Sequence, residues 1–245
     1  MRQAHNLKVD GSNPSPRNQK MNKTKFETKY YHPTLRKKIS FEIKSFLGRA
    51  YSPKIRKTKK NYLQLGSGHL DLDKYDDIEN LDFYDITFKN FFGLTNFFKK
   101  KSFGHDLRYP LPYDNNVFKG VYSEHTLEHL YPFEAINLLK EIHRVLITDG
   151  VLRITVPDLD KYINACNDVK TPFFLQFRNN CEMIWSLTQN YAHLSVWNYE
   201  MLKLQLEACG FSKITKTEFN KGINSNLLID KEGREPETLY IEAIK

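Results

Sequence analysis

Residues 118–156 read FKGVYSEHTLEHLYPFEAINLLKEIHRVLITDGVLRITV, a strand, a helix and a second strand in direct succession. FKGVYS at 118–123 is typical of a buried strand, and 134–146 carries apolar residues at helical spacing along one face. Asp149-Gly150 then indicates a turn, and VLRITV at 151–156 predicts the next strand, which Pro157 ends. Two strands joined by an amphipathic helix predict a parallel pair with a crossover connection.

The same alternation continues on both sides of this stretch. Strands are expected at 62–65 and 78–83, and a helix at 199–209 that Gly210 closes. Two further strands, 212–219 and 238–244, have no helix between them, which suits an antiparallel pair. The predicted fold is therefore α/β, a doubly wound, mostly parallel sheet of about seven strands with an antiparallel pair at its C-terminal edge.

The first sixty residues differ in composition from the rest of the 245-residue chain. They hold 17 lysines and arginines against three acidic residues, a net charge of +14, whereas the remainder carries −6. Residues 1–28 are polar and are predicted to be a disordered tail. Because the codons of Gly11–Pro14 can resemble the T-arm of a tRNA gene, we expect residues 1–20 to be upstream sequence, with translation starting at Met21.

Residues 29–60 are predicted to form a basic amphipathic helix and a linker, followed by one domain at 61–245. The apolar stripe of this helix consists of Leu35, Ile39, Ile43, Phe46 and Leu47. We expect the stripe to pack on its own domain, and the alternative is that it lies on a membrane. The basic charge suits nucleic acid, an anionic membrane or an acidic partner, or it belongs to a solvated tail.

Targeting signals are not apparent in the sequence. No apolar run approaches the roughly 18 residues needed to span a bilayer, and the polar N-terminus is unlike a secretory signal. The three cysteines are far apart and match no C-x-x-C pattern, so free thiols are expected. These features predict a cytoplasmic protein.

Two glycines follow the first strand, in Gly66-Ser67-Gly68. Glycines in this place let a nucleotide approach the backbone closely, although such a pair is commonly only a turn. Asp82 lies at the end of the next strand, where a carboxylate can bind two ribose hydroxyls. Leu70 stands where a third glycine would complete a dinucleotide motif, so NAD binding is disfavoured.

The segment His125-Thr-Leu-Glu128-His129 matches H-x-x-E-H, a zinc-peptidase pattern. Such a site needs both histidines in one regular helix, but His125 lies two residues beyond a buried strand, and Pro132 soon follows. We therefore expect no metal. His125 is expected at the carboxyl edge of the sheet, where ligands bind, whereas Glu128 and His129 are expected to be scaffold.

Five motifs follow one another in the chain: LQLGSG, NLD, DLRYPLPYDNNVFKGV, SEHTLEHL and LKEIHRVLITDGVLRITVPD. In this order, residues 61–245 resemble the class I S-adenosylmethionine (SAM)-dependent methyltransferases, and most of all a small bacterial group of type 11-like members. The resemblance implies a Rossmann-like sheet, methyltransferase activity and SAM as cofactor. The sequence departs from the wider class at Gln64, where an acidic residue is common, and at Lys119, where aspartate is usual.

The resemblance assigns the cofactor site to Leu65, Gly66, Ser67, Gly68, Asp82, Phe83, Asp106, Leu107, Ser123 and Glu124. It implies that the glycine segment contacts methionine and ribose through its backbone, that Asp82 binds the ribose hydroxyls and that Asp106 faces the adenine amine. His125 is the first candidate for a general base and His193 the second. A structural, hydrogen-bonded role is the alternative for both, and is favoured for His193.

The aromatic-rich region at 159–197 is expected to shape the acceptor site, although such residues are more often core. The expected reaction is O-methylation of a small molecule or glycan by in-line methyl transfer. RNA methylation with residues 29–60 tracking phosphates is one alternative. A non-catalytic, SAM-binding interaction module is the other. Residues 84–105 are left without an assigned element.

Overall fold

The computed structural model describes residues 34–51, 55–66, 75–82, 103–167 and 171–245. Within them, one sheet has the strand order β3-β2-β1-β4-β5-β7-β6. The strands are β1 Tyr62–Leu65, β2 Ile78–Asp82, β3 Phe103–Gly104, β4 Phe118–Glu124, β5 Leu146–Pro157, β6 Ser212–Thr217 and β7 Thr238–Ile244. The first five strands pair in parallel, and β7 runs antiparallel to both β5 and β6. The predicted α/β sheet with its antiparallel C-terminal edge pair is confirmed.

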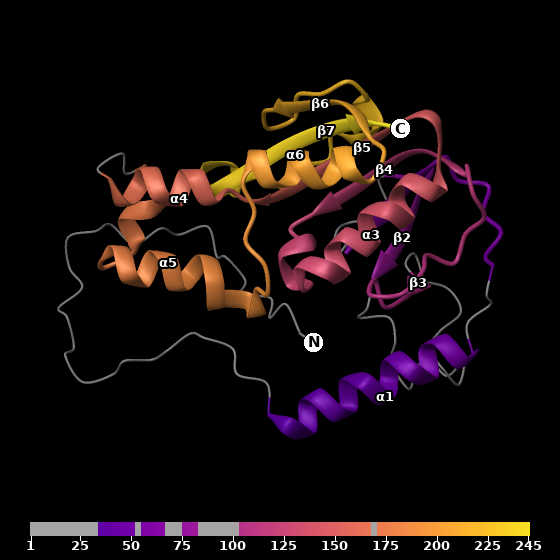
Figure 1. The fold of residues 1–245 in the computed structure, drawn as a ribbon, viewed down its shortest axis with the longest axis horizontal. Helices are drawn as coiled ribbons and strands as arrows, with labels where there is room; N and C mark the ends of the chain where they lie inside the picture. The colour runs from indigo at the N-terminus through magenta and orange to yellow at the C-terminus, as the bar shows by residue number, and fades with distance from the viewer. Residues whose placement is uncertain (1–33, 52–54, 67–74, 83–102, 168–170) are drawn as a thin grey trace.

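Five α-helices and five short 3-10 helices accompany the sheet in the described residues. The α-helices are α1 Leu35–Tyr51, α3 Pro132–Val145, α4 Leu159–Cys166, α5 Asn180–Gln189 and α6 Tyr199–Ala208. The 3-10 helices are η3 Leu127–His129, η4 Phe174–Gln176, η5 Asn190–Ala192, η6 Ser225–Leu227 and η7 Glu235–Glu237. Figure 1 shows α3 and α6 side by side over the sheet. Buried leucines on both, such as Leu138 and Leu202, join strand residues such as Val121 in the main apolar core.

The crossover helix α3 begins two residues before its predicted start. Pro132 occupies the first turn, where a missing N–H costs nothing. The Glu134 carboxylate accepts a hydrogen bond from the backbone N–H of Tyr131 at 3.0 Å, which satisfies one of the free donors at the helix start. The strand–helix–strand unit predicted from residues 118–156 is thus confirmed, with a small shift of its helix.

The turn predicted at Asp149-Gly150 is instead a kink inside β5, which runs without a break from Leu146 to Pro157. Asp149 has a positive φ of 61°, a conformation that aspartate adopts more readily than most residues. Its N–H donates to the carbonyl of Lys245 at 3.3 Å, so the kink stays paired with the end of β7. Asp149 and Gly150 thus change the direction of the backbone as predicted, but they do not mark the start of the strand, which begins at Leu146.

The opposite face of the sheet is covered, in the described part, by η6 and the residues after it. Leu227 and Ile229 pack there on Tyr122 and Val151. Beside them, the Arg153 guanidinium is fully buried between two carboxylates. Its Nε donates to Asp230 Oδ1 at 2.9 Å, and its Nη1 donates to Glu242 Oε1 at 3.1 Å. This ion-pair group ties β5 to β7 and to the loop that follows β6.

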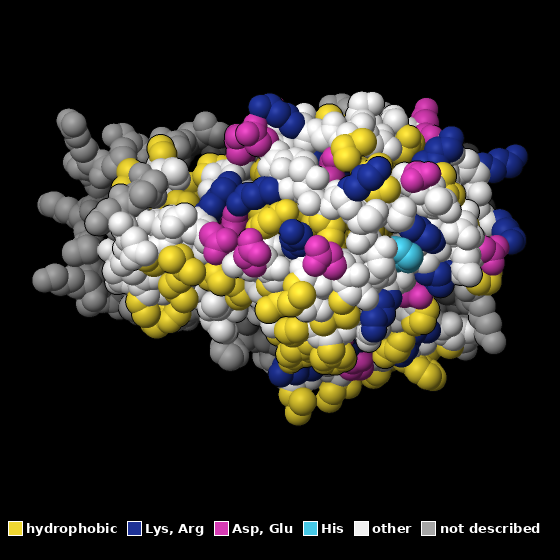
Figure 2. All heavy atoms as spheres, turned by 45° about the horizontal axis from the view of Figure 1, so that its top comes forward, with side chains coloured by type: hydrophobic (Ala, Val, Ile, Leu, Met, Phe, Trp, Pro, Cys, Tyr) yellow, Lys and Arg dark blue, Asp and Glu magenta, His cyan; other side chains and the backbone are white. Residues whose placement is uncertain are grey.

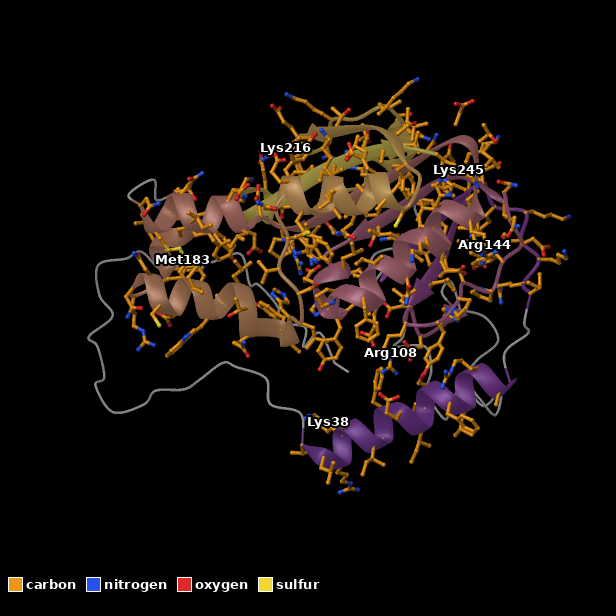
Figure 3. All side chains as sticks on the ribbon, in the orientation of Figure 1. Lys38, Arg108, Arg144, Met183, Lys216 and Lys245 are labelled. Carbon is orange, nitrogen blue, oxygen red and sulfur yellow. The ribbon has the colours of Figure 1, made fainter. Side chains whose placement is uncertain are left out.

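Helices α4 and α5 form a small unit of their own between β5 and α6. Tyr162, Phe174, Met183 and Leu187 make up its buried core, and Met183 lies between the two helices in Figure 3. Much of the aromatic content of residues 159–197 is therefore core. This outcome agrees with the more common role of such residues.

Helix α1 docks on the domain through a face that the sequence did not predict. The expected stripe of Leu35, Ile39, Ile43 and Phe46 is exposed, with relative exposures between 51% and 72%. The buried side chains are instead Phe41 and Ser45, from the other side of the helix. The expectation that the stripe packs on its own domain is therefore wrong. None of the described helices is both long and apolar enough to cross a membrane.

Charges of both signs are distributed over the surface. Figure 2 shows basic and acidic side chains interspersed on one face, without a field of a single sign on the part drawn in colour. Such a face lacks the continuous basic stripe that proteins use to follow a phosphate backbone.

Candidate active site

Three neighbouring strands end side by side at the carboxyl edge of the sheet. The parallel register places Leu65 of β1 beside Ser123 of β4. Gly66, Asp82 and Glu124 therefore lie together at this edge, where open α/β sheets bind their ligands. The structure brings together this part of the predicted cofactor site. The predicted contacts Ser67, Gly68 and Phe83 lie outside the described residues.

Gly66 has a backbone conformation and surroundings that only glycine fits. Its φ is +68°, and a Cβ at this position would lie 2.2 Å from Thr126 Oγ1. Its N–H donates to the carbonyl of Leu81 at 2.9 Å. The Thr126 hydroxyl lies within hydrogen-bonding distance of the carbonyls of Leu65 at 3.2 Å and Glu124 at 3.0 Å. Thr126 thus links the ends of β1 and β4, a role that the sequence did not reveal.

The same edge carries buried polar groups. Asp82 is the last residue of β2 and is buried. Among the described residues, the hydroxyls of Ser123 and Thr155 are buried without a hydrogen-bond partner. Glu124 is engaged, because its Oε1 accepts the backbone N–H of Lys231 at 2.8 Å. The register puts Ser123 on one face of the sheet, with Ile154, and Thr155 on the other face, with Glu124. Because buried hydroxyls normally have partners, each of the two could receive a polar ligand from its own face.

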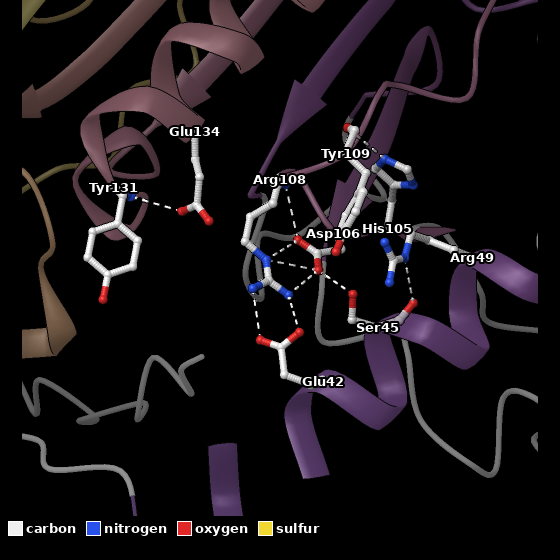
Figure 4. A network of polar contacts seen from close by, with 9 residues as sticks. All are labelled: Glu42, Ser45, Arg49, His105, Asp106, Arg108, Tyr109, Tyr131 and Glu134. Carbon is white, nitrogen blue, oxygen red and sulfur yellow. Dashed lines mark hydrogen bonds and ion pairs between the residues drawn. The ribbon is translucent and has the colours of Figure 1, made fainter. Parts of the chain in front are cut away.

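Asp106 lies at the next strand end, in a network that holds α1 (Figure 4). Its carboxylate accepts hydrogen bonds from Arg108 Nη2 at 2.7 Å and from the hydroxyl of Ser45 in α1. The other edge of Arg108 donates to both oxygens of Glu42 in α1, at 2.8 and 3.0 Å. Figure 3 shows Arg108 between the sheet and α1. The carboxylate that the resemblance assigns to adenine is thus occupied by groups that dock the N-terminal helix.

The electrostatics of Asp106 agree with these contacts. Burial by itself raises the pKa of the Asp106 carboxyl. The hydrogen bonds from Arg108 and Ser45 lower this pKa by more, so that it lies below the ordinary value. Leu107, the neighbouring predicted contact, is partly buried and packs against the main core. Both residues serve the packing of the domain in the described structure.

His125, the first candidate base, lies directly after β4 with a positive φ of 45°. Its Nε2 is 2.8 Å from Thr238 Oγ1, and this hydroxyl donates its own proton to the carbonyl of Arg234 at 2.7 Å. His125 Nε2 must therefore be the donor. Its Nδ1 faces Glu128 Oε1 at 3.2 Å. Both ring nitrogens thus face groups of the protein itself.

A second group of polar side chains lies beside His125. Glu128, His129 and His193 have ligand-type atoms that all lie within 4.8 Å of one another. Burial raises the pKa of Glu128, but His125 above all, and then His129 and His193, lower it to about 2. Burial lowers the pKa of His129 to about 4. His193, the second candidate base, is thus placed with two residues that the sequence assigned to the scaffold.

Other contacts of this region could not be predicted from the sequence. The H-x-x-E-H pattern contains two members of the group, but His193 follows His129 by 64 positions and stands in no motif. The contacts of α1 with the Asp106 network are similarly distant in the chain, since 61 positions separate Ser45 from Asp106 and 66 separate Glu42 from Arg108. Only the folded chain brings these residues together.

Part of the chain is similar to known proteins. Residues 98–154 match a family described as "Methyltransferase domain". A comparison with curated proteins found no match. Similar solved structures include a SAM-dependent methyltransferase from Thermotoga maritima, with 16% identity, 86% of this chain and 96% of that chain covered, and a TM-score of 0.48. Another, from Archaeoglobus fulgidus, has 20% identity, 84% and 94% coverage and a TM-score of 0.45. A third, from Mesorhizobium loti, has 16% identity, 81% and 95% coverage and a TM-score of 0.47.

The family match covers β4, α3 and most of β5, the unit from which the fold was predicted. Residues 98–154 therefore match a methyltransferase domain family, and the resemblance of the sequence implies SAM as cofactor. The residues at the carboxyl edge fit this group. Gly66 leaves room for close approach, Asp82 supplies a buried carboxylate, and the Ser123 hydroxyl lacks a partner in the described residues.

Proposed function

We propose that this enzyme transfers the methyl group of SAM to an oxygen atom of a small molecule or glycan. The observation that carries the proposal is the place of the α4–α5 unit, which follows the carboxyl end of β5 directly. The segment after this unit lies beside the carboxyl edge of the sheet, because the Leu194 N–H donates to the carbonyl of Glu128 at 2.7 Å. We propose that the acceptor binds between this unit and the carboxyl edge of the sheet.

The bound cofactor supplies an electrophilic methyl group on its sulfonium. The protein's part is to align donor and acceptor and to exclude water, which is worth up to roughly 7–11 kcal/mol in well-oriented systems. Asp82 would hold the ribose. The free hydroxyls of Ser123 and Thr155 lie on opposite faces of the sheet, and either one could form a hydrogen bond with a reacting partner on its own face. These groups lie at or near the ends of β2, β4 and β5, so one sheet holds them in a rigid frame.

The contacts of His125 support a positioning role for this residue more than the role of a base. Its ring connects Glu128 to Thr238, so it orders the segment beside the reaction edge. His125→Ala should lower turnover far more than SAM affinity in either role. A base would also give the wild-type enzyme an ionisation in its pH–rate profile that the variant lacks. An unchanged profile shape supports positioning, and unchanged turnover removes the residue from the mechanism.

RNA methylation is less well supported by the described structure. In this alternative residues 29–60 would track phosphates, but α1 uses Glu42 and Ser45 to bind the Asp106–Arg108 pair. This segment therefore takes part in the packing of the domain. Charges of both signs on the face in Figure 2 also suit a small acceptor better than a polynucleotide.

The test has two stages. Calorimetry with SAM should show binding that Asp82→Ala weakens, and unchanged affinity in this variant would remove Asp82 from the ribose site. A screen with methyl-labelled SAM over glycans, nucleotide sugars and RNA should then transfer label to a hydroxyl of a small acceptor. Transfer to RNA alone, or SAM binding without transfer to any acceptor, would contradict the proposal.

A further inference from the structure

Glu128, His129 and His193 meet where η3 lies against the segment that leaves η5. Their ligand-type atoms lie within 4.8 Å of one another, and the set is two imidazoles and one carboxylate. This is a donor set that zinc and related divalent metals use in proteins. It differs from the peptidase pattern in the sequence, because His125 is not a member and His193 takes its place.

The Glu128 carboxylate gives independent evidence for a cation. The side chain is 1% exposed, and neither of its oxygens accepts a hydrogen bond of regular geometry among the described residues. A buried carboxylate whose close contact is a single imidazole nitrogen is costly, and such a group in a native fold calls for a further partner. His125 Nδ1 lies 3.2 Å from Oε1 of this carboxylate, and ligand-type atoms of His129 and His193 lie within 4.8 Å of it.

His193 is oriented as a metal ligand would be. Its Nδ1 lies 2.6 Å from the carbonyl of Leu187, which can only accept, so Nδ1 is the donor. The lone pair is then on Nε2. Metal-binding histidines commonly donate their second ring nitrogen to a backbone carbonyl in this way, which fixes the tautomer and the ring.

The segment that carries His193 is also held in place on η3. The N–H groups of Leu194 and Ser195 both donate to the carbonyl of Glu128, at 2.7 and 3.2 Å. The Ser195 hydroxyl donates to the carbonyl of Leu127 at 3.1 Å. The three residues are therefore brought together by the fold itself and do not depend on a mobile loop for their proximity.

We propose that Glu128, His129 and His193 bind one divalent metal ion of the zinc class. Tetrahedral coordination at about 2.0–2.2 Å would place the ligand atoms about 3.4 Å apart, a contraction that side-chain torsions can supply. Three protein ligands leave a fourth position for water or another ligand. The ion connects the segment after η5, which carries His193, to η3 at the carboxyl end of β4. His125 contacts Glu128 through its Nδ1 and helps to orient this ligand.

The experiment uses the full chain, freed of metal with a chelator and titrated with ZnCl2 by calorimetry and with CoCl2 by absorbance. We expect one equivalent to bind, a rise in Tm on binding, and the visible bands of tetrahedral cobalt. His129→Gln and His193→Gln should weaken binding by more than the roughly 10–100-fold that loss of an outer partner costs. His125→Gln should fall within that roughly 10–100-fold range.

The matched control is His143→Gln, on α3, whose ring packs on Phe211 away from this group. It should bind metal as the wild type does. Circular dichroism checks that each variant is folded. If a variant does not fold, X-ray absorption of the zinc-loaded wild type decides the question, because two imidazoles should appear in the first shell. Three results would overturn the site: failure of the wild type to bind one equivalent of metal, binding by His129→Gln and His193→Gln as tight as that of the wild type, or a zinc coordination shell that contains no imidazole.

Discussion

Replacing Gly66 by alanine tests the geometry of the cofactor edge directly. The added Cβ would lie 2.2 Å from Thr126 Oγ1 and 3.0 Å from Thr126 Cγ2, in a residue with a φ of +68°. Neither atom can simply withdraw, because the Thr126 hydroxyl contacts the carbonyls of Leu65 and Glu124. The substitution therefore combines backbone strain with a steric conflict.

The two effects can be estimated separately. An L-residue in the left-handed region costs about 1–2 kcal/mol, and overpacking a filled site costs about 1–3 kcal/mol. Gly66→Ala should thus lower the free energy of unfolding by about 2–5 kcal/mol. For a chain of this size, each kcal/mol shifts Tm by roughly 2–4 °C. If residue 66 moves and so relieves part of the strain, SAM should bind more weakly instead. Its Kd would rise tenfold for each loss of about 1.4 kcal/mol of binding free energy.

The assay is urea denaturation followed by tryptophan fluorescence, together with SAM calorimetry. The control is Thr126→Ala, alone and combined with Gly66→Ala. Thr126→Ala by itself should cost about 0.5–1.5 kcal/mol through its lost hydrogen bonds. In the double variant the 2.2 Å conflict is gone, and the backbone strain and a tight 3.1 Å contact with the Cβ of residue 126 remain. It should be about 1–3 kcal/mol more stable than the sum of the single changes predicts.

Additive effects, within about 0.3–0.5 kcal/mol, would refute the proposed contact between residue 66 and Thr126. A loss below about 1 kcal/mol in Gly66→Ala would show that the left-handed backbone is not required. Either result would also remove the main structural reason for a glycine at the end of β1.

Two further substitutions test buried charge. Arg153→Met should lower the free energy of unfolding by about 3–5 kcal/mol, because it leaves the Asp230 and Glu242 carboxylates buried without their guanidinium. Urea denaturation measures this loss. A loss below about 1 kcal/mol would contradict the stabilising role of the ion pairs. Asp106 has a folded pKa below its unfolded value, since burial raises it less than Arg108 and Ser45 lower it. Its stabilising effect is therefore present above about pH 4 and is lost as pH falls through the folded pKa, so Asp106→Asn should flatten the acid limb of stability against pH.

The sheet could be predicted from the sequence because its signals are local. Buried strands such as 118–123 are short apolar runs, and α3 has an apolar face at helical spacing. These patterns depend on neighbours in the chain, and parallel order follows from the helix between two strands. The predicted edge position of Gly66 and Asp82 follows from the same reasoning, since both end parallel strands.

The docking of α1 could not be predicted in this way. Its apolar stripe suggested the wrong face, because the real contacts are Phe41 and a polar group centred on Arg108. An ion-pair network between residues 66 positions apart, such as Arg108 and Glu42, leaves no periodic signal in the sequence. The same network explains why Asp106 is committed to packing in the described structure, although its place in the motif suggested adenine.

The segment at 125–129 shows most clearly what local patterns lack. Its spacing suggested a metal with His125 and His129 as a pair, and the argument against a regular helix was sound, since η3 is only a short 3-10 helix. That argument excluded one geometry, not every metal geometry. The fold turns His125 toward Thr238 and brings His193 from a distant segment to Glu128 and His129, the group that we propose binds a metal. A spacing rule describes ligands within one helix, whereas this site depends on backbone hydrogen bonds between two segments.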